Sequence, residues 1–554
     1  MKTLCNSVPG LICFLFISFF LAMNSSGQVK ITFIVDTKEL IDSGYFKEGD
    51  KLIIRGSFNQ WAGYDDELIE KYEESFLLGN DFNIDCKAGD MIEYKFVIIT
   101  PEGIEYWEQN PNPENPPHGN RLLVCDDSGN TLPVADFNYG DDIKGRRLSR
   151  LEILQADFMQ ARTILEQNHP ALYDYTSKEI LDSLFNHYYN LISQETEYNI
   201  FYQYISAILA EIGCGHTKLF IPDAYWTSKP DHFFPLQLQI NPDEVIVKGS
   251  YGQTEKIPRG SLVLSINGKP ITDILQELMI LESSDGFIPA FKINSIQKRF
   301  PEKYAMLYGF PDTFRIAFIA PEKSIPLDSL IPSATRQQVQ SVPMRGQELS
   351  MNQFREHDAA MITINTFGYY AEVPKFKAFI DSCFMVLRSQ NIGNLIIDLR
   401  GNDGGDPFCA SYLFSYLEKT PVPYFEEHYG HYDTLAHPVP MPENHYTGNT
   451  FVIIDGGGFS TTGHLCGLLK YHGLVTFVGT DLGSTYTCTG NVMYPGLDHT
   501  HLILGTARER RYSAAVEGLD PKAGIAPDHV VRTGREDIIN GDDAQLNFIL
   551  SLLK

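Results

Sequence analysis

The sequence predicts a multidomain α/β protein, and three observations support this fold class. A chain of 554 residues is too long for a single hydrophobic core. Its apolar fraction of 43% is typical of a globular protein. Along the chain, short strands bounded by turn residues give way to helical periodicity, then to short strands again, and finally to apolar strands that alternate with helices. We therefore expect several domains of different classes.

The first residues are typical of an export signal, with expected boundaries of residues 1–27. Lys2 supplies a positive charge, Leu11–Met23 is apolar, and small residues up to Gly27 offer a cleavage site. The apolar stretch is short for a membrane span, and Cys13 within it lacks the small residues that precede the cysteine of a lipoprotein signal. We expect an exported product, periplasmic or extracellular, with no membrane span after cleavage.

Charge and cysteine content limit the partners. The formal net charge of −26 argues against nucleic acid as a partner, because the phosphates would be repelled. Two of the nine cysteines, Cys5 and Cys13, lie in the signal, and no C-x-x-C pair among the others suggests a metal site. We expect neither a metal nor a cofactor. Cys86 and Cys125 could bridge within the first domain, although the sequence does not fix the pairing.

Residues 28–138 are expected to form an Ig-like antiparallel β-sandwich. Apolar or alternating runs such as Lys30–Asp36 and Ile92–Thr100 are separated by Gly, Asn, Asp and Pro. Trp61 and Trp107 lie in polar surroundings that predict loops. Exposed indole rings in such places suit the apolar faces of sugar rings.

The segments GSFNQW, IEYKFVI and WEQNPN resemble the starch-binding carbohydrate module of glucoamylases and related enzymes. The resemblance implies that Trp61 and Trp107 stack on the sugar, that Lys95 and Asn112 hydrogen-bond to it, and that the partner is a starch-like α-glucan. The run after Asn112 is longer than is usual in that family. The alternative is that both tryptophans are core residues of a sandwich that binds nothing.

Residues 139–224 are expected to be a charged linker followed by helices. Apolar residues recur every three or four positions between Leu148 and Ile212. The helices end at the segment GHTKL, which contains His216. A lone histidine after a helix is commonly structural, so its role depends on what the fold places beside it.

Residues 225–335 resemble a PDZ-like domain. Lys256–Ile271 has the glycine, apolar strand, Asn-Gly turn and second strand of such a module, and a helix is expected over Asp273–Leu281. PDZ domains take up an extended peptide as an added strand. The alternative is a plain β-subdomain without a ligand.

Residues 336–554 alternate apolar strands with helices, and the stretch Phe451–Lys470 is central to them. Apolar β-formers run into three glycines, then Ser460, then a segment of helical spacing. A serine at a helix N-terminus is commonly an N-cap. Its hydroxyl also meets exposed N–H groups and the positive end of the helix dipole, so it could attack a carbonyl carbon. Both interpretations stay open on this stretch alone.

A second glycine-rich turn lies within Asn394–Asp406, written NLIIDLRGNDGGD. A buried strand ends there in a turn that contains Gly404 and Gly405. Adjacent glycines allow backbone N–H groups to point at a ligand, as an oxyanion hole requires. No G-x-G-x-x-G motif follows a strand and no P-loop occurs, so nucleotide binding has little support.

Taken in order around a PDZ-like insert, the motifs GHTKL, DLRGNDGG and GGFSTTG resemble the C-terminal processing and tricorn-type serine peptidases of the tail-specific protease family. The resemblance implies a ClpP/crotonase-like α/β core and a serine-type endopeptidase acting on a peptide or protein. It implies Ser460 as the nucleophile and His216 as its general base. Glu517 is the expected acid that orients the histidine, with Asp520 as the alternative.

The same resemblance implies that the oxyanion is held by the N–H of Gly404 or Gly405 together with that of Thr461. One branch of the family uses a lysine base about 25 residues after the serine. No lysine occurs between Lys470 and Lys522, so that branch is disfavoured.

Two departures from the family pattern support a second hypothesis. Gly215 stands where tricorn-type enzymes have a serine, and Gly463 stands where the family commonly has a glutamate. The chain could therefore be a catalytically weakened or inactive peptidase-like scaffold that binds carbohydrate or peptide. A glycoside hydrolase, suggested by the starch-like module, has no paired-carboxylate motif to support it.

Overall fold

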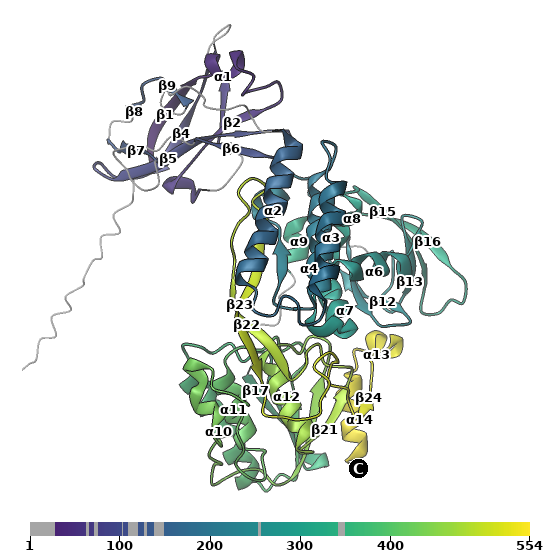
Figure 1. Ribbon diagram of the computed structural model, residues 1–554. Coiled ribbons are helices and arrows are strands. Elements are labelled where there is room, and N and C mark those ends of the chain that lie inside the picture. The colour runs from purple at the N-terminus through teal and green to yellow at the C-terminus, as the bar shows by residue number, and fades with distance from the viewer. Residues whose placement is uncertain are drawn as a thin grey trace, which may run out of the picture. The chain divides into compact units, whose positions relative to one another are not determined.

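The computed structural model describes residues 28–61, 66–70, 76–101, 103–108, 120–126, 130–137, 149–252, 256–341 and 349–553. The predicted signal and Asn112 lie outside these ranges. The chain forms two compact units, of which the first comprises most residues up to 146 and the second runs from 147 to the C-terminus (Figure 1). The three C-terminal parts expected from the sequence thus share one unit.

The N-terminal unit is a mostly antiparallel β-sheet around one apolar core. Its strands pair in the order β6-β5-β2-β3-β4-β1-β8, with β7 beside β5 and β9 beside β1. Phe33, Ile54 and Phe96 are fully buried in the core. The elements are β1 (Gln28–Asp36), α1 (Lys38–Asp42), β2 (Lys51–Gly56), β3 (Glu67–Glu70), β4 (Leu77–Asp85), β5 (Met91–Ile99), β6 (Glu105–Trp107), β7 (Arg121–Val124), β8 (Asn130–Thr131) and β9 (Ala135–Asp136).

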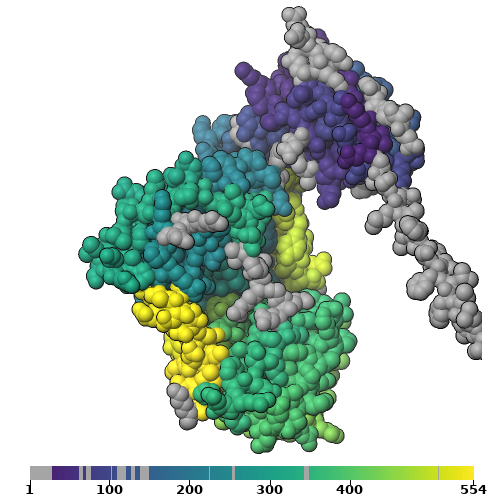
Figure 2. All heavy atoms as spheres, turned by 180° about the vertical axis from the view of Figure 1, so that it is seen from behind, coloured from purple at the N-terminus to yellow at the C-terminus, as the bar shows by residue number. Residues whose placement is uncertain are grey.

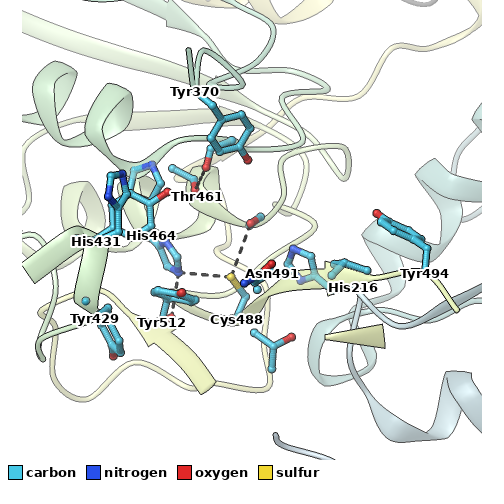
Figure 3. Close-up of a pocket in the computed structure, with 18 residues that line it drawn as sticks. His216, Tyr370, Tyr429, His431, Thr461, His464, Cys488, Asn491, Tyr494 and Tyr512 are labelled. Atoms are coloured by element: carbon cyan, nitrogen blue, oxygen red, sulfur yellow. Dashed lines mark hydrogen bonds between the residues drawn. The ribbon is translucent and has the colours of Figure 1, made fainter. Parts of the chain in front are cut away.

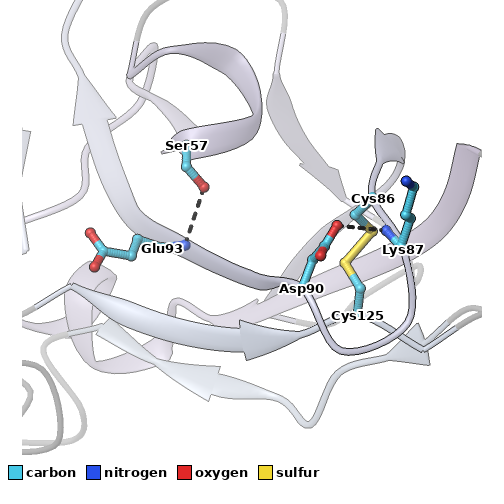
Figure 4. The surroundings of a disulfide bond; sticks show 6 residues. All are labelled: Ser57, Cys86, Lys87, Asp90, Glu93 and Cys125. Carbon is cyan, nitrogen blue, oxygen red and sulfur yellow. Dashed lines mark hydrogen bonds between the residues drawn. A yellow bond between two sulfur atoms is a disulfide. The ribbon is translucent and has the colours of Figure 1, made fainter. Parts of the chain in front are cut away.

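A disulfide joins the ends of two strands in this unit (Figure 4). Cys86 follows β4 and Cys125 follows β7, and their Cα atoms lie 6.4 Å apart. The N–H of Lys87 donates to Asp90 Oδ2 at 2.9 Å and closes the turn between the bridge and β5. The pairing that the sequence allowed is confirmed.

The second unit begins with three helices, α2 (Arg150–Asn168), α3 (Lys178–Leu191) and α4 (Tyr198–Ile212). Ser149 caps α2 through a reciprocal pair of hydrogen bonds with Glu152, which satisfies two otherwise unpaired backbone donors. The apolar stripes of the helices pack together in one core. Helix α4 ends at Gly213, whose φ of 71° is the left-handed conformation that glycine adopts readily.

Residues 236–332 form an antiparallel sheet with three helices against it. The strands follow the order β11-β12-β13-β15-β16, with β14 beside β13, and helix α6 lies where the sequence predicts one. The elements are α5 (Asp223–Thr227), β11 (Leu236–Ile240), β12 (Val245–Ser250), β13 (Leu262–Ile266), β14 (Lys269–Pro270), α6 (Ile271–Ile280), α7 (Pro289–Lys298), α8 (Phe300–Tyr308), β15 (Thr313–Ile319), β16 (Leu327–Pro332) and α9 (Arg336–Gln340). We call residues 225–335 the insert lobe.

The remaining residues form an α/β layer structure. Strands β18, β19, β20, β21 and β24 are parallel in that order, and β17 pairs antiparallel with β18 at the edge. Helices α10, α11 and α12 pack on one face of this sheet and α14 on the other. The elements are β17 (Leu349–Phe354), β18 (Ala359–Ile364), α10 (Val373–Ser389), β19 (Asn394–Asp398), α11 (Pro407–Ser415), β20 (Asn449–Ile454), α12 (Thr461–Tyr471), β21 (Thr476–Gly479), β24 (His529–Val530), α13 (Arg535–Asn540) and α14 (Ala544–Leu552).

One further sheet links the helices to the α/β layers. Strand β23 (Ile503–Ser513) pairs on one side with β22 (Thr487–Met493) and on the other with β10 (Lys218–Phe220), which follows α4. The C-terminal helices α13 and α14 run along the outer surface between the insert lobe and the α/β layers (Figure 2). Within the described ranges, no helix is both long and apolar enough to cross a bilayer.

Candidate active site

A cavity of about 800 Å³ lies at the carboxyl ends of β19 and β20 (Figure 3). This edge of a parallel sheet is where ligands bind in open α/β folds. Its walls come from distant parts of the chain, namely Gly405 after β19, Ser460 before α12, Cys488 on β22, Tyr512 on β23 and His216 before β10. Histidines line the cavity, but no lysine, arginine or carboxylate does so in the described part of the chain.

Ser460 is held in an unusual backbone conformation at the start of α12. Its φ of 56° and ψ of −122° lie in a region that non-glycine residues rarely adopt. The side chain makes no N-cap hydrogen bond, although the residue occupies the N-cap position. The hydroxyl instead lies in the cavity, 3.8 Å from Cys488 Sγ. The sequence left open whether Ser460 is an N-cap, and its side chain does not perform that role.

Two backbone N–H groups beside Ser460 are suited to hold an oxyanion. The N–H of Thr461 is the first of α12, where no intrahelical acceptor is available. The N–H of Gly404 already donates to Asn402 Oδ1 at 3.0 Å, which leaves Gly405 as the second donor. Gly405 has a φ of 137°, and a Cβ there would lie 2.2 Å from the backbone of Phe367. Only glycine fits this position.

His216 reaches the cavity from the turn between α4 and β10. Its ring lies 4.6 Å from that of Phe459, which directly precedes Ser460. Burial lowers the pKa of His216 to about 3, and the nearby Lys218 lowers it further. The imidazole is therefore neutral at pH 7, as a general base must be. Its Nδ1 atom is buried and has no hydrogen-bond partner among the described residues.

Ser460 and His216 thus line the same cavity, but no hydrogen bond between them is present in the described part of the chain. The Ser460 hydroxyl must turn from Cys488 toward His216 before a proton can pass between them. Such contacts are often long in enzymes without substrate and tighten when the substrate binds.

Two residues of the cavity were missed by the sequence analysis. Cys488 Sγ lies 3.5 Å from His464 Nε2, and that nitrogen lies 3.0 Å from the carbonyl oxygen of Tyr512. Because a carbonyl only accepts, we assign the proton of His464 to Nε2, which is then unable to take a proton from Ser460. Burial lowers the pKa of His464 to about 4 and raises the pKa of Cys488. The spacing of four between Ser460 and His464 was the available signal, since it places both on one helical face.

The expected acid is not beside the histidine in this structure. Glu517 is exposed and does not line the cavity. Asp520 is also exposed and accepts from the N–H of Lys522 at 2.8 Å. The carboxylate nearest to the histidine along the hydrogen-bond network is instead Asp285 of the insert lobe, which accepts from the N–H of Gly215 at 2.8 Å.

The predicted sugar-binding residues lie in the N-terminal unit. The rings of Trp61 and Trp107 are 6.3 Å apart and inclined by 32°, and both are half-buried. The sequence analysis expected Trp107 in a loop, but this residue is the last of strand β6. The guanidinium of Arg55 lies 5.2 Å from the Trp107 ring. Burial lowers the pKa of Lys95, which lies on β5.

No group of three or more His, Cys, Asp or Glu side chains in the described residues is arranged to hold a metal ion. We therefore assign no residues to a metal.

Comparison with known proteins agrees with this α/β site. Residues 358–531 match the family model of Peptidase family S41, which supports a peptidase for this part of the chain. The matched range contains Gly405, Ser460 and Glu517 but not His216. No curated protein sequence matches the chain.

Solved structures resemble a larger part of the chain. Mature CPAF aligns at 13% identity over 72% of this chain and 96% of its own, with a TM-score of 0.50. A mutant of CPAF aligns at 11% identity with the same coverage and a TM-score of 0.53. The photosystem II D1 C-terminal processing protease aligns at 13% identity over 72% of this chain and 97% of its own, with a TM-score of 0.38. The CPAF alignments show a shared fold.

Proposed function

We propose that the chain is a serine peptidase that hydrolyses peptide bonds through an acyl-enzyme on Ser460. The observation that carries this proposal is the state of Ser460 itself. Its backbone is strained, its side chain does not cap the helix, and its hydroxyl faces a cavity that also holds a neutral histidine. Two N–H groups there, those of Gly405 and Thr461, have no acceptor among the described residues. A strained serine between a strand and a helix is the arrangement that exposes a nucleophile in other hydrolase folds.

The chemistry follows from these groups. His216 takes the proton of the Ser460 hydroxyl while Oγ attacks the carbonyl carbon of the substrate. The resulting oxyanion accepts from the N–H groups of Gly405 and Thr461, and the loss of one such donor costs about 3 kcal/mol, or roughly 100-fold in rate. His216 then gives its proton to the leaving amine, and water hydrolyses the ester on Ser460.

A serine-reactive fluorophosphonate probe tests the assignment. We expect the probe to label the full-length protein at Ser460, and Ser460→Ala to lose both labelling and peptide hydrolysis with its folding unchanged. Ser382→Ala is the matched control, because Ser382 lies on α10, does not line the cavity, and its hydroxyl donates to the carbonyl of Phe379. Peptide turnover that persists in Ser460→Ala would rule out this nucleophile. A wild-type protein that neither labels nor cleaves would favour the binding scaffold.

The endopeptidase type is a further part of the proposal, since no lysine, arginine or carboxylate among the described residues lines the cavity to bind a free chain terminus. Mass spectrometry of a digested unfolded protein separates the alternatives. Internal fragments support an endopeptidase, and stepwise loss of terminal residues contradicts it.

For the N-terminal unit we propose binding of a starch-like α-glucan by Trp61 and Trp107. The proposal is supported by two half-buried indoles that lie side by side, because sugars stack on such surfaces. Burying ~100 Å² on each ring at ~25 cal/mol per Å² gives ~5 kcal/mol before ordering is subtracted, which corresponds to weak binding. Affinity electrophoresis in an amylose gel should retard the wild type and not Trp107→Ala. Equal retardation of the two proteins would remove the proposal.

Export is proposed on the N-terminal sequence and on the Cys86–Cys125 disulfide, since such bridges persist in oxidising compartments. The mass of the mature protein tests it. We expect a chain that begins at Gln28, and a product that retains Met1 would contradict export by this signal.

A further inference from the structure

The insert lobe contributes a buried carboxylate to the turn that carries His216. Asp285 is 3% exposed and begins a 3-10 turn, Asp285–Phe287, between α6 and α7. Its Oδ1 accepts from the N–H of Gly215 at 2.8 Å, and its Oδ2 accepts from Ser484 Oγ at 3.4 Å. No lysine, arginine or histidine forms an ion pair with Asp285 in the described ranges.

Arg511 and Lys218 act on Asp285 from a distance, but neither forms an ion pair with it. A buried carboxylate without an ion pair is expensive unless hydrogen bonds to it are made, so its location calls for an explanation. Burial raises the pKa of Asp285 to about 6, and the hydrogen bond from Gly215 opposes that rise. An apolar residue of similar size would remove the desolvation penalty. It would also leave the Gly215 N–H without an acceptor inside the protein.

The turn Asp285–Phe287 and the segment before His216 exchange hydrogen bonds, each donating one to the other. The N–H of Gly286 donates to the carbonyl oxygen of Gly213 at 3.0 Å, next to the bond from Gly215 to Asp285. Gly286 and Phe287 have φ values of 52° and 69°, and a Cβ on Gly286 would lie 2.6 Å from the Cα of Lys522. A non-glycine residue at positive φ persists only where its surroundings impose it.

Gly215 is also confined on its other side. A Cβ on this residue would lie 2.6 Å from the ring of Phe459, the residue before Ser460. The backbone that carries His216 is therefore held between the Phe459 ring and the Asp285 carboxylate. The His216 ring itself packs on the same phenylalanine, at 4.6 Å between centroids.

We propose that Asp285 is a positioning residue for His216, acting through the Gly215 N–H to hold the imidazole where it can reach Ser460. This inference rests on the proposed peptidase function. It assigns to the insert lobe a direct part in the geometry of the base, because displacement of a reacting group by about 1 Å can reduce the rate 100-fold.

Two substitutions at one site test the role. Asp285→Ala removes the acceptor, and we expect kcat to fall about 100-fold with KM nearly unchanged, since Asp285 does not line the cavity. Asp285→Asn keeps an oxygen at the same place, and we expect it to restore kcat to within roughly threefold of the wild type. Fluorophosphonate labelling of Ser460 should follow kcat in both variants.

The control is Asp381→Ala on α10. Asp381 Oδ1 accepts from the hydroxyls of Tyr412 and Tyr416 at 2.5 Å each, so the variant also loses a hydrogen-bonded carboxylate, away from the cavity. We expect a lower Tm and an unchanged kcat. If Asp285→Ala does not fold, Asp285→Ser replaces it, because its short side chain leaves space for water and does not reach Gly215.

Two results would overturn the proposal. One is an Asp285→Ala protein with kcat within about threefold of the wild type. The other is an Asp285→Asn protein as slow as Asp285→Ala, since that would assign the effect to the charge. Amide hydrogen exchange over residues 213–217 provides a readout without turnover. Faster exchange in Asp285→Ala but not in Asp285→Asn supports the positioning role even if Ser460 is not labelled, and exchange unchanged in both contradicts it.

Discussion

The pH dependence of the reaction is the most direct consequence of the buried histidines. Burial lowers the pKa of His216 to about 3, so the base stays neutral far below the range in which an ordinary histidine gains a proton. We expect the rate of fluorophosphonate labelling at Ser460 to persist from pH 7 down to about pH 5. The perturbation is acid alone, and the assay needs no substrate sequence.

The size of the effect follows from the two pKa values. At pH 5, a histidine with a pKa of 6.5 is ~3% neutral, whereas one with a pKa of 3 is ~99% neutral. Burial thus raises the neutral fraction of the base about 30-fold at that pH. Burial raises the pKa of Asp285 to about 6, but no step in rate is expected there, because the protonated carboxyl keeps an oxygen that accepts from the Gly215 N–H. Asp285→Asn should therefore leave the profile unchanged.

Stability changes in the opposite sense and must be measured beside the rate. In the unfolded chain histidines take up protons below pH 6.5, whereas in the folded chain His216 and His464 stay neutral down to about pH 3 and about pH 4. Unfolding therefore binds protons, and the free energy of unfolding declines as the pH falls below 6.5. Thermal melts at each pH identify the range in which the protein is folded.

A labelling rate that halves near pH 6.5 while the melts show a folded protein would refute this reasoning. His431 also lines the cavity, so the profile is repeated with His431→Gln to exclude its contribution. If the fall near pH 6.5 survives in that variant and in Asp285→Asn, the base is an ordinary solvated histidine, and the burial of His216 has no functional effect.

Three further predictions concern an oxyanion donor, the disulfide of the N-terminal unit and a buried ion pair of the second unit. Gly405→Ala places a Cβ 2.2 Å from neighbouring backbone and displaces an oxyanion donor, so kcat should fall at least ~100-fold. Steady-state peptide hydrolysis measures kcat and KM separately, and a normal kcat would contradict the assignment of this N–H. Replacement of Cys86 and Cys125 by serine removes the bridge and opens a loop of 39 residues, so the free energy of unfolding of the N-terminal unit should fall by about 4 kcal/mol. Urea unfolding monitored by tryptophan fluorescence measures this change, and an unchanged midpoint would contradict it. Arg400→Met leaves the buried Asp398 without its bidentate partner and should destabilise the second unit by about 3–5 kcal/mol in the same assay, whereas a loss of activity without destabilisation would show that the arginine is catalytic.

Much of the α/β core could be predicted from the sequence, because its signals are local. The run from Phe451 through three glycines to Ser460 already indicates a strand, a turn and a helix, and the structure places β20 and α12 there. The paired glycines after β19 likewise predicted backbone N–H groups that point at a ligand, and Gly405 lines the same cavity as Ser460. Arg400 belongs to the same motif. Its guanidinium donates to Asp543 at the start of α14 and so links β19 to that helix.

The other parts of the site depend on pairings between distant segments. Cys488 lies in the cavity because β22 pairs with β23, and the sequence does not show the register of these strands. Asp285 belongs to a different lobe from the serine, so no spacing connects the two. Trp107 was expected in a loop because polar residues follow it, but its strand is short and ends at the tryptophan. The position of Glu517 relative to the histidine depends on a loop conformation that periodicity does not specify.

Strand β23 has a consequence for the order in which the fold is completed during synthesis. It lies near the C-terminus, yet it pairs with β10, which continues from the histidine turn that is made hundreds of residues earlier. This pairing must wait until nearly the whole chain has left the ribosome. The histidine turn of the proposed peptidase therefore gains its support from β23 only after Ser460 has been synthesised.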